Sequence, residues 1–381
     1  MDFNPTEEQK MIRDMVRDFA EKELRPIADE IDRKSEYPAE AIKKLCELGV
    51  MGILVPEEYG GSGASYLSYI LVVEELSRVC ASTGVIVETH ISLGTEPIID
   101  YGTEEQRRMY LPRLAKGELI GSFALTESNA GSDSSALKTI AVRDGDEYVL
   151  NGSKMFISNA GVAGTTIVFA KTDKEAPGVR GISAFIVERD TEGYIVGPPL
   201  DKLGIRASKT AILTFENMRV PKENMLGKPG EGFKIAMHAL DGGRIAIASQ
   251  ALGIAQASYE DAIGYAKERV QFGKPISYLY AIQEIIADMA TDIEAARLLT
   301  YHAAWLKETG LKYSKEASMA KLFASDAAMK HSVKAVQVHG GNGYMMEYPV
   351  QRHMRDAKIT QIYEGTNEVL KMVIANNVFK K

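Results

Sequence analysis

The chain has 381 residues, of which 45% are hydrophobic and 25% charged, a composition typical of a globular protein with two or three domains. Its 45 basic and 52 acidic residues give a formal net charge of −7, which argues against general binding of nucleic acid or anionic membranes. Two cysteines, Cys46 and Cys80, exclude a disulfide framework and a cysteine-based zinc site. The six histidines show no metal-ligand spacing, so no metal site is predicted.

The sequence predicts neither export nor membrane insertion. The first thirty residues are densely charged and lack the pattern of a signal peptide. The longest uncharged run, Met155–Ala170, is too short and too polar to span a bilayer. We therefore expect a cytoplasmic protein, or a protein of the mitochondrial matrix if a eukaryotic transit peptide has been removed.

Residues 1–120 carry a helical pattern and are predicted to form an N-terminal α-helical domain. Thr6 and Gln9 have the spacing of a capping box, which satisfies free backbone N–H groups at the start of a helix. Apolar residues then recur three and four positions apart, as on one face of a helix. Pro26 should end or bend this first helix, and Leu67–Val79 carries a further apolar helical face.

Residues 121–230 change to an alternating pattern and are predicted to form a middle β domain. Turn signals at Asp144–Asp146 and Asn151–Gly152 indicate two β-hairpins. Six short runs rich in β-branched and aromatic residues favour an antiparallel barrel or sandwich over a parallel α/β sheet. These runs are Ile140–Val142, Tyr148–Leu150, Met155–Ile157, Thr166–Ala170, Ile182–Val187 and Ala211–Phe215.

Residues 231–381 return to a helical pattern and are predicted to form a C-terminal four-helix bundle. The fold class is therefore α+β, with the order α, β, α. Helices this long carry more apolar surface than one small domain buries, so we also expect contacts between subunits. The predicted long helices are Phe233–Arg269, Ile276–Thr309, Ser314–Val338 and Asn367–Val378.

Several common catalytic motifs are absent from the sequence. No G-x-G-x-x-G follows a strand and opens a helix, which leaves a nicotinamide-type Rossmann site unsupported. There is also no phosphate-binding P-loop, no H-E-x-x-H zinc motif and no G-x-S-x-G nucleophile elbow. These absences remove the commonest NTPase, zinc-protease and serine-hydrolase interpretations.

Four clusters of small, polar and charged residues are candidates for a site. Ala124–Ala136 is rich in hydroxyl groups and suits a polar planar ligand, although such a mixture is also typical of a linker. Gln337–Tyr344 has three glycines in four residues, which indicates backbone pressed against phosphate or another chain, whereas a helix cap needs only one. Arg269–Pro275 is either a solvated helix cap or a clamp for a diphosphate.

The fourth cluster, Ile362–Glu368, places a carboxylate, Glu364, directly before Gly365. In an apolar pocket, desolvation would raise the pKa of Glu364 toward neutrality and make it a usable base. The alternative is a surface glutamate that precedes Thr366, the N-cap of the last helix, and this is the commoner fate of a lone glutamate. The two interpretations are compatible, because a residue at the start of a helix is held by local backbone.

At these four clusters the sequence resembles the acyl-CoA dehydrogenase family. Two of the matching segments resemble the long signatures of that family, and the third resembles the segment that carries its catalytic base. The resemblance covers essentially the whole chain and keeps the α-β-α order. The three segments are Thr126–Asp133, Gln337–Asp356 and Ile362–Thr366.

The resemblance implies FAD as cofactor and an acyl-CoA as substrate. Glu364 would act as the catalytic base that removes the α-proton, while the β-hydrogen leaves as a hydride to flavin N5 and a trans-2-enoyl-CoA forms. Electrons would then pass to an electron-transferring flavoprotein, and the chain would form a homotetramer. Implied cofactor contacts are Phe123, Leu125, Thr126, Ser132, Phe156, Ser158, Arg269, Phe272, Gln337, Gly340, Gly341, Thr366 and Glu368, and implied substrate contacts are Ser132, Asp241, Arg244, Tyr363 and Gly365.

The implied diphosphate and adenosine site is shared between chains. Arg269 and Phe272 of one subunit would meet Gln337–Gly341 of its neighbour. Tyr280 stands where relatives often have a glutamine against the neighbouring FAD, and Phe156 stands where many have tryptophan. These two departures leave the contacts of both positions open.

The substrate is expected to be a short- or medium-chain acyl-CoA. Leu240–Ala251 most resembles the short-chain, butyryl-CoA branch, and Gly243 occupies the alternative position of the base, which leaves Glu364 as the candidate. Val79–Gly102, the expected floor of the acyl pocket, contains Glu88 and no lysine or arginine, which argues against a dicarboxylic acyl group. Branched or alicyclic acyl groups stay open. So do an acyl-CoA oxidase and a non-catalytic nucleic-acid-binding homologue, although the negative net charge argues against the last.

Overall fold

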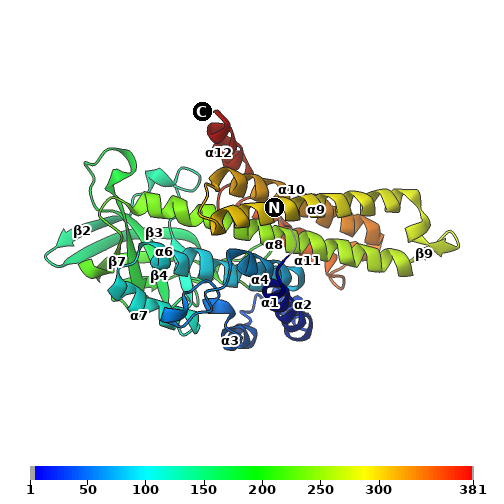
Figure 1. Ribbon diagram of the computed structural model, residues 1–381, viewed down its shortest axis with the longest axis horizontal. Helices are drawn as coiled ribbons and strands as arrows, with labels where there is room; N and C mark the ends of the chain where they lie inside the picture. The colour runs from blue at the N-terminus through cyan, green and yellow to red at the C-terminus, as the bar shows by residue number, and fades with distance from the viewer. Residues whose placement is uncertain (1–4, 380–381) are drawn as a thin grey trace.

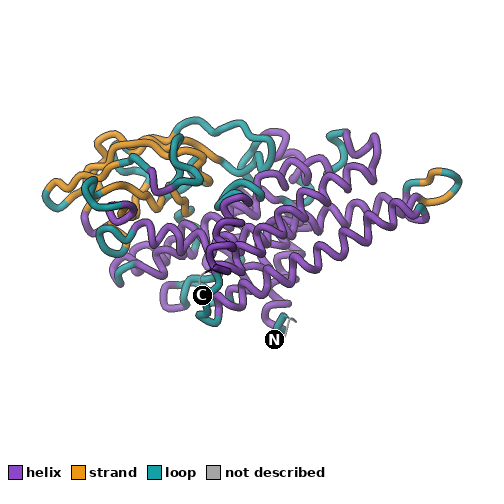
Figure 2. The backbone as a smooth tube through the Cα atoms, turned by 90° about the horizontal axis from the view of Figure 1, so that it is seen from above, coloured by secondary structure: helices purple, strands orange, loops and turns teal. Residues whose placement is uncertain are grey.

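The computed structural model describes residues 5–379 and confirms the predicted α-β-α order (Figure 1). The N-terminal helices, blue to cyan, lie beside the long C-terminal helices. The molecule is elongated, with the sheet at one end and a narrow helical arm at the other (Figure 2). Among the residues described, no helix combines the length and the apolar character that a bilayer crossing requires.

Between residues 5 and 120 the chain forms seven α-helices, and one of them, Tyr66–Val79, lies within one residue of the predicted Leu67–Val79. The Thr6–Gln9 capping box is present, and Pro26 lies in the turn after the first helical segment. Separate helices between Ala81 and Thr95 are not predicted, because this stretch is buried and has no polar face. The elements are α1 Glu7–Phe19, α2 Ala28–Lys34, α3 Ala39–Glu47, α4 Tyr66–Val79, α5 Ala81–Glu88, α6 Glu96–Tyr101 and α7 Glu104–Ala115, with π-helical turns at Ala20–Leu24 and Thr89–Thr95.

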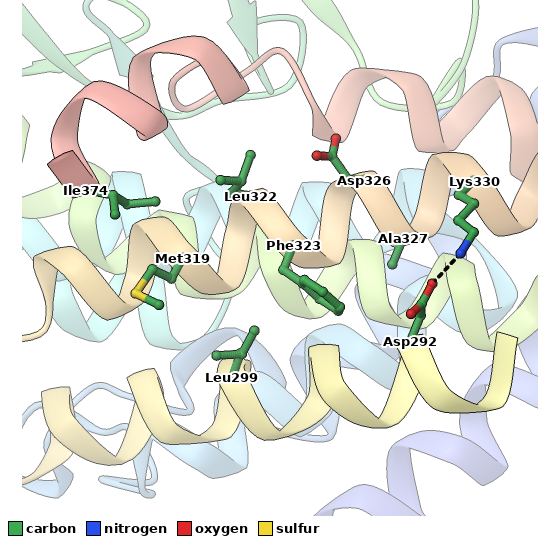
Figure 3. A pocket seen from close by; sticks show the side chains of 9 residues that line it. All are labelled: Asp292, Leu299, Met319, Leu322, Phe323, Asp326, Ala327, Lys330 and Ile374. Carbon is green, nitrogen blue, oxygen red and sulfur yellow. Dashed lines mark hydrogen bonds and ion pairs between the residues drawn. The ribbon is translucent and has the colours of Figure 1, made fainter. Parts of the chain in front are cut away.

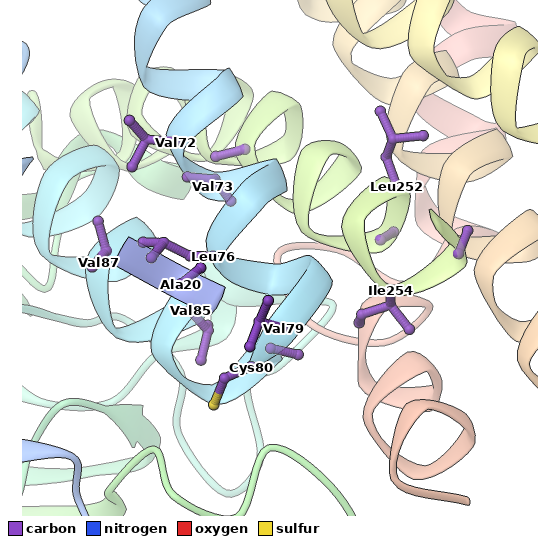
Figure 4. Close-up of a cluster of buried hydrophobic side chains, with 14 of the residues drawn as sticks. Ala20, Val72, Val73, Leu76, Val79, Cys80, Val85, Val87, Leu252 and Ile254 are labelled. Atoms are coloured by element: carbon purple, nitrogen blue, oxygen red, sulfur yellow. The ribbon is translucent and has the colours of Figure 1, made fainter. Parts of the chain in front are cut away.

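The hydrophobic core joins the N-terminal helices to the bundle. Helix α4 is buried along its whole length and packs against α1, α5 and α8 (Gly232–Glu268). Val72, Val73 and Leu76 of α4 belong to the same buried cluster as Leu252 of α8 (Figure 4). Full burial of one such side chain contributes about 1.5–3 kcal/mol, so α4 holds one face of α8 firmly in place.

The middle part of the chain is one eight-stranded sheet, in the order β6-β7-β3-β2-β4-β5-β8 with β1 beside β4. Most neighbouring strands are antiparallel, as predicted, but β1 runs parallel to β4 and β2 meets β4 in a parallel bridge. The sheet is therefore mixed. Its strands are β1 Gly121–Ala124, β2 Ile140–Asp144, β3 Glu147–Ser158, β4 Thr165–Lys171, β5 Ile182–Glu188, β6 Tyr194–Val196, β7 Thr210–Pro221 and β8 Met225–Leu226.

The predicted hairpin at Asn151–Gly152 is wrong, because both residues lie within the continuous strand β3. The pairing of β3 with β7 shifts between Leu150 and Gly152, which marks a β-bulge. Glycine is required there, since a Cβ at this position would lie 2.8 Å from the Cα of Thr139. Asp144–Asp146 does form the predicted turn, between β2 and β3.

The C-terminal part is the predicted helical bundle, formed by α8, α9, α10 and α11, with α12 packed on α10, although α11 is not among the predicted helices. Helices α8, α10 and α12 begin and end within one residue of the predicted positions, whereas α9 starts four residues late, after a 3-10 turn. A short hairpin at the end of α8 forms the tip of the arm (Figure 2). The bounds are α9 Tyr280–Glu308, α10 Ser314–His339, α11 Val350–Thr360, α12 Asn367–Phe379, β9 Val270–Gln271 and β10 Lys274–Pro275.

Helix α11 holds the three parts of the fold together. Asp356 accepts a hydrogen bond from the N–H of Ile205 at 2.6 Å, and Arg352 donates to the carbonyl of Val79 at 3.1 Å. Both charged side chains are buried. They connect the bundle to the sheet domain and to the N-terminal helices, so these residues of the second signature are structural.

Candidate active site

Glu364 lies on the loop between α11 and α12 in a left-handed backbone conformation. Its φ is 53° and that of Gly365 is 105°, a region that favours glycine. Arg244 of α8 donates from Nε to the Glu364 carbonyl at 3.2 Å. Thr366 caps α12, as predicted, since its Oγ1 accepts the N–H of Val369 at 3.3 Å. The loop is therefore fixed on both sides of Glu364.

Gly243 of α8 provides the space for the Glu364 carboxyl group. A Cβ at position 243 would lie 3.0 Å from the Glu364 carboxyl carbon and closer still to Oε2. That Oε2 atom is buried and has no hydrogen-bond partner within residues 5–379. A buried polar atom without a protein partner is costly, which marks it as a group that meets a ligand.

Glu88 is a second buried carboxyl group coupled to Glu364. Its side chain has no exposed surface and accepts a hydrogen bond from the hydroxyl of Ser92 at 2.5 Å. Burial raises the pKa of Glu88 to about 7. Burial is also the main cause that raises the pKa of Glu364 well above its ordinary value, and the neighbouring Glu88 carboxyl raises it further. The sequence places Glu88 in the pocket floor but does not predict this coupling.

Two cations oppose this rise in the pKa of Glu364. Lys321 of α10 and Arg244 both favour the ionised carboxylate. Arg244 pairs with Asp241 at 2.5 Å, so these two predicted substrate residues do lie together beside Glu364. Lys321 is absent from the sequence prediction. Only its position in an alanine-rich stretch of helix hints that it is buried.

Tyr363 and Glu368 lie on either side of Glu364 and have opposite environments. The hydroxyl of Tyr363 donates to Gln250 of α8, whose Nε2 donates in turn to the Ala81 carbonyl at 3.0 Å. Tyr363 thereby ties the loop to the protein interior. Glu368 is exposed at the start of α12, and a hydrogen bond from its own backbone N–H lowers its pKa.

The loop that follows β1 is fixed by a buried ion pair. Glu127 binds Nζ of Lys154 at 2.8 Å and also accepts the N–H groups of Lys138 and Thr139 at 2.6 and 3.0 Å. Lys154 has no exposed surface, and burial lowers its pKa to about 8. Its Nζ also donates to the Leu125 carbonyl at 3.0 Å. Glu127 of the first signature thus shapes the loop from inside.

Thr126, on the loop after β1, is hydrogen-bonded to β3 one residue before Phe156. Phe156 is 62% exposed although its φ is 60°, and the N–H of Met155 donates to the Thr126 carbonyl at 2.8 Å. An aromatic ring held open beside a loop with a hydroxyl group fits the planar, hydrogen-bonding ring system of a flavin. Phe156, Thr126 and the nearby half-buried Ser158 are therefore suited to hold it.

The other predicted flavin residues of this region differ in exposure. Phe123 is buried, and its ring packs against Phe169 with centroids 4.8 Å apart. Leu125 is buried as well, so the backbone groups of these two residues, and not their side chains, are available to contact a cofactor. Ser132 lies exposed on the loop.

The predicted diphosphate and adenosine contacts lie at the far end of the bundle. Tyr265 of α8 stacks on His339 of α10 with centroids 4.2 Å apart, which brings the ends of the two helices together. About 26 residues of α8 separate Gly243 from this end, roughly 39 Å at 1.5 Å per residue. One chain therefore does not bring these contacts to Glu364. The distant residues, all exposed, are Arg269, Phe272, Gln337, Gly340 and Gly341.

The buried carboxyl oxygen of Glu364, unpartnered across the described residues, and the exposed aromatic ring of Phe156 fit the class of flavin-dependent oxidoreductases. Comparison with known families identifies three matching regions. The acyl-CoA dehydrogenase N-terminal domain matches residues 6–118, the middle domain matches 122–218 and the C-terminal domain matches 230–379. The chain belongs to the acyl-CoA dehydrogenase family.

Individual relatives match along the whole chain. The short-chain specific acyl-CoA dehydrogenase of Clostridium acetobutylicum is 55% identical over 380 residues and covers 100% of both chains. Butyryl-CoA dehydrogenase from Megasphaera elsdenii superimposes with a TM-score of 0.98 at 50% identity over all of both chains. A chain in a structure of the electron-transferring flavoprotein of Acidaminococcus fermentans gives 0.99 at 54% identity, also over all of both chains.

The cofactor is FAD. An acyl-CoA dehydrogenase from Bacillus anthracis solved with FAD has a TM-score of 0.94 at 36% identity, and the match covers 99% of this chain and 68% of that one. The enzyme is thus an acyl-CoA dehydrogenase that uses a flavin. The individual contacts predicted for the flavin and the substrate stay predictions.

Proposed function

We propose that the enzyme converts a short-chain acyl-CoA such as butyryl-CoA into the trans-2-enoyl-CoA, with Glu364 as the base. The buried Glu364 Oε2, which has no partner in the described part of the chain, carries this proposal. Its raised pKa makes the ionised carboxylate a better proton acceptor near neutral pH. The two relatives named for short-chain and butyryl-CoA substrates support the length of the acyl chain.

In the proposed reaction the α-proton of the thioester moves to Oε2 of Glu364. The electron pair of that C–H bond forms the new double bond between the α- and β-carbons. FAD, when bound, accepts the hydride that leaves the β-carbon. The N–H of Glu364 has no acceptor among residues 5–379, and we assign it the thioester carbonyl, where negative charge develops.

The proposed acyl pocket ends in buried polar groups, which favours a short monocarboxylic chain. Glu88 lies beside Glu364, and its carboxyl group would repel a second carboxylate at the end of the acyl chain. Branched and alicyclic short acyl groups stay open within the same chemistry.

We further propose that two chains are needed to complete each cofactor site, as in a homotetramer built from two dimers. The exposed residues at the end of the arm are too far from Phe156 and Glu364 to serve the same flavin in one chain. An apolar surface on the helical bundle supports the larger assembly. It is a groove of about 570 Å³ on α9, α10 and α12, lined chiefly by Leu299, Met319, Leu322, Phe323, Ala327 and Ile374 (Figure 3).

We propose an electron-transferring flavoprotein as the partner that reoxidises the flavin. The likeness to a chain solved in a structure of such a flavoprotein supports this assignment. An acyl-CoA oxidase, which would use oxygen, is the alternative. Rapid reoxidation of the reduced enzyme by oxygen alone would favour the oxidase.

Anaerobic mixing of the yellow holoenzyme with acyl-CoAs of increasing length tests the proposal. Butyryl-CoA should bleach the flavin absorbance fastest, and glutaryl-CoA should leave it unchanged. Glu364→Gln should keep FAD bound and remain yellow, because the amide cannot accept the α-proton. Bleaching of this variant at the wild-type rate would show that Glu364 is not the base.

A further inference from the structure

Lys321 is a buried lysine directly behind the Glu364 loop. It lies on α10 between alanine and leucine, and its side chain has no exposed surface. Its Nζ donates to the Gly365 carbonyl at 2.8 Å and to Oδ1 of Asn367 at 3.2 Å. The ammonium group therefore binds the loop on the two sides of Thr366, immediately after the residue that we propose as the base.

Four charged groups from the surrounding elements act on this ammonium group. They are Glu364 on the loop, Arg244 on α8, Asp326 on α10 and Glu368 on α12. Burial lowers the pKa of Lys321 to about 7, and the Glu364 carboxyl group opposes this shift most strongly. Lys321 and Glu364 thus stabilise one another's ionised forms.

Fixing the loop by itself does not require a charge at position 321. Thr366 already caps α12, and Asn367 is also held by Asp326, to which its Nδ2 donates at 2.8 Å. Burying an ammonium group costs free energy that a methionine of similar length would avoid. The retained charge therefore points to a role in the electrostatics of the neighbouring carboxylate.

We propose that Lys321 is a positioning residue for the reaction, which holds the left-handed Glu364–Gly365 turn in place and stabilises the carboxylate form of Glu364. This inference rests on the proposed role of Glu364. Through the Gly365 carbonyl, Lys321 fixes the direction of the Glu364 backbone N–H and side chain. Through its charge, it favours the ionised form of Glu364, which is the form that accepts a proton, and so opposes the effects of burial and of Glu88.

Two substitutions separate the two parts of this role. Lys321→Met removes both the charge and the hydrogen bonds, whereas Lys321→Gln keeps a donor but removes the charge. Both variants should raise the pKa that limits kcat/KM for butyryl-CoA on the acid side, by about one unit, because a nearby cation is lost. The methionine variant should in addition lose roughly 100-fold in kcat, because the base is no longer held in position.

Amide hydrogen exchange without substrate provides a readout independent of turnover. Residues 361–367 should exchange faster in Lys321→Met than in the wild type and should be partly protected again in Lys321→Gln. Lys315→Met is the matched control, because Lys315 lies on the same helix but is only partly buried and pairs with Glu316 instead of the Glu364 loop. It should leave exchange, pH profile and kcat unchanged.

Wild-type kcat, pH profile and exchange in Lys321→Met would overturn the inference. If Lys321→Met does not fold, Lys321→Gln tests the inference. A wild-type pH profile together with wild-type amide exchange in Lys321→Gln would then overturn it. Full activity of Glu364→Gln would instead remove the proposed base, whatever the result at Lys321. The two failures are therefore distinguishable.

Discussion

Gly243 and Glu364 are complementary, because the carboxyl group of one occupies the space that a side chain on the other would need. They come from α8 and from the loop before α12, 121 positions apart in the sequence. The glycine at the alternative position of the base is thus also the residue that makes room for Glu364. This relationship leads directly to a test.

Gly243→Ala should strongly reduce activity without harming the fold. Alanine favours a helix over glycine by about 1 kcal/mol, but its Cβ would push the Glu364 carboxyl group aside. We expect kcat to fall roughly 100-fold, since a displacement of about 1 Å can have that effect. Gly264→Ala on the same helix is the control, because no atom of residues 5–379 lies within 4 Å of a Cβ placed there. It should stay fully active, and equal activity of the two variants would contradict the packing argument.

Glu88→Gln should shift the pH dependence of the reaction. The Glu88 carboxyl group raises the pKa of Glu364, so its replacement by an amide should lower that pKa. The acid limb of kcat/KM should then move to lower pH by about one unit. Glu40→Gln, at an exposed position, should leave the profile in place. A profile of Glu88→Gln identical to the wild type would show that the two carboxyl groups are not coupled.

The same variant should change how stability depends on pH. The pKa of Glu88 is about 7 in the folded protein, above its ordinary value of 4.5. Its contribution is therefore fully present below pH 4.5 and is lost as the pH rises through 7. The Tm of Glu88→Gln should rise relative to the wild type between pH 5 and pH 8. A constant Tm difference across this range would contradict the raised pKa.

Lys154→Met should destabilise the loop that follows β1. The substitution leaves the buried Glu127 carboxylate without its cation, and breaking a buried ion pair typically costs about 3–5 kcal/mol. Chemical unfolding at fixed protein concentration measures this loss. The double variant Glu127→Gln with Lys154→Met should lose less than Lys154→Met alone. Equal stability of the single variant and the wild type would count against a structural role for the pair.

Phe272→Ala should weaken cofactor binding while leaving the individual chain intact. Phe272 is 89% exposed, so its removal takes nothing from the core of one chain. If it contacts the cofactor of a neighbouring chain, the loss should be about 1–2 kcal/mol, roughly tenfold in the Kd for FAD. Val142→Ala, at an exposed position on β2, is the control. Unchanged FAD affinity would argue against the shared site.

The sequence predicts the long helices of the bundle closely because their signals are local. Periodic apolar faces and the cap at Thr366 fix α8, α10 and α12 within a residue. The predicted turn at Asn151–Gly152 is wrong because the same dipeptide also suits a bulge within a long strand. Only the pairing of this segment with β7 distinguishes a turn from a bulge. Local composition carries no information about that partner.

The charged residues around the site show the same limit. Glu364 is recognised from its motif, but the coupling to Glu88 and the burial of Lys321 depend on how distant helices pack. Each of these side chains is an ordinary surface residue by type. Charges become informative only when their surroundings are known, so a chain read in isolation underestimates the electrostatic part of the site.

Helix α8 runs without interruption for 37 residues, past Gly243 and on to the start of the arm. Because an unbroken helix is nearly incompressible along its axis, it acts as a spacer whose length is set by backbone geometry. In the proposed assembly, the number of residues in α8 would then set the distance between one catalytic centre and the next. Inserting or deleting one full turn in α8 would change the spacing of the whole oligomer, even where every local contact survived.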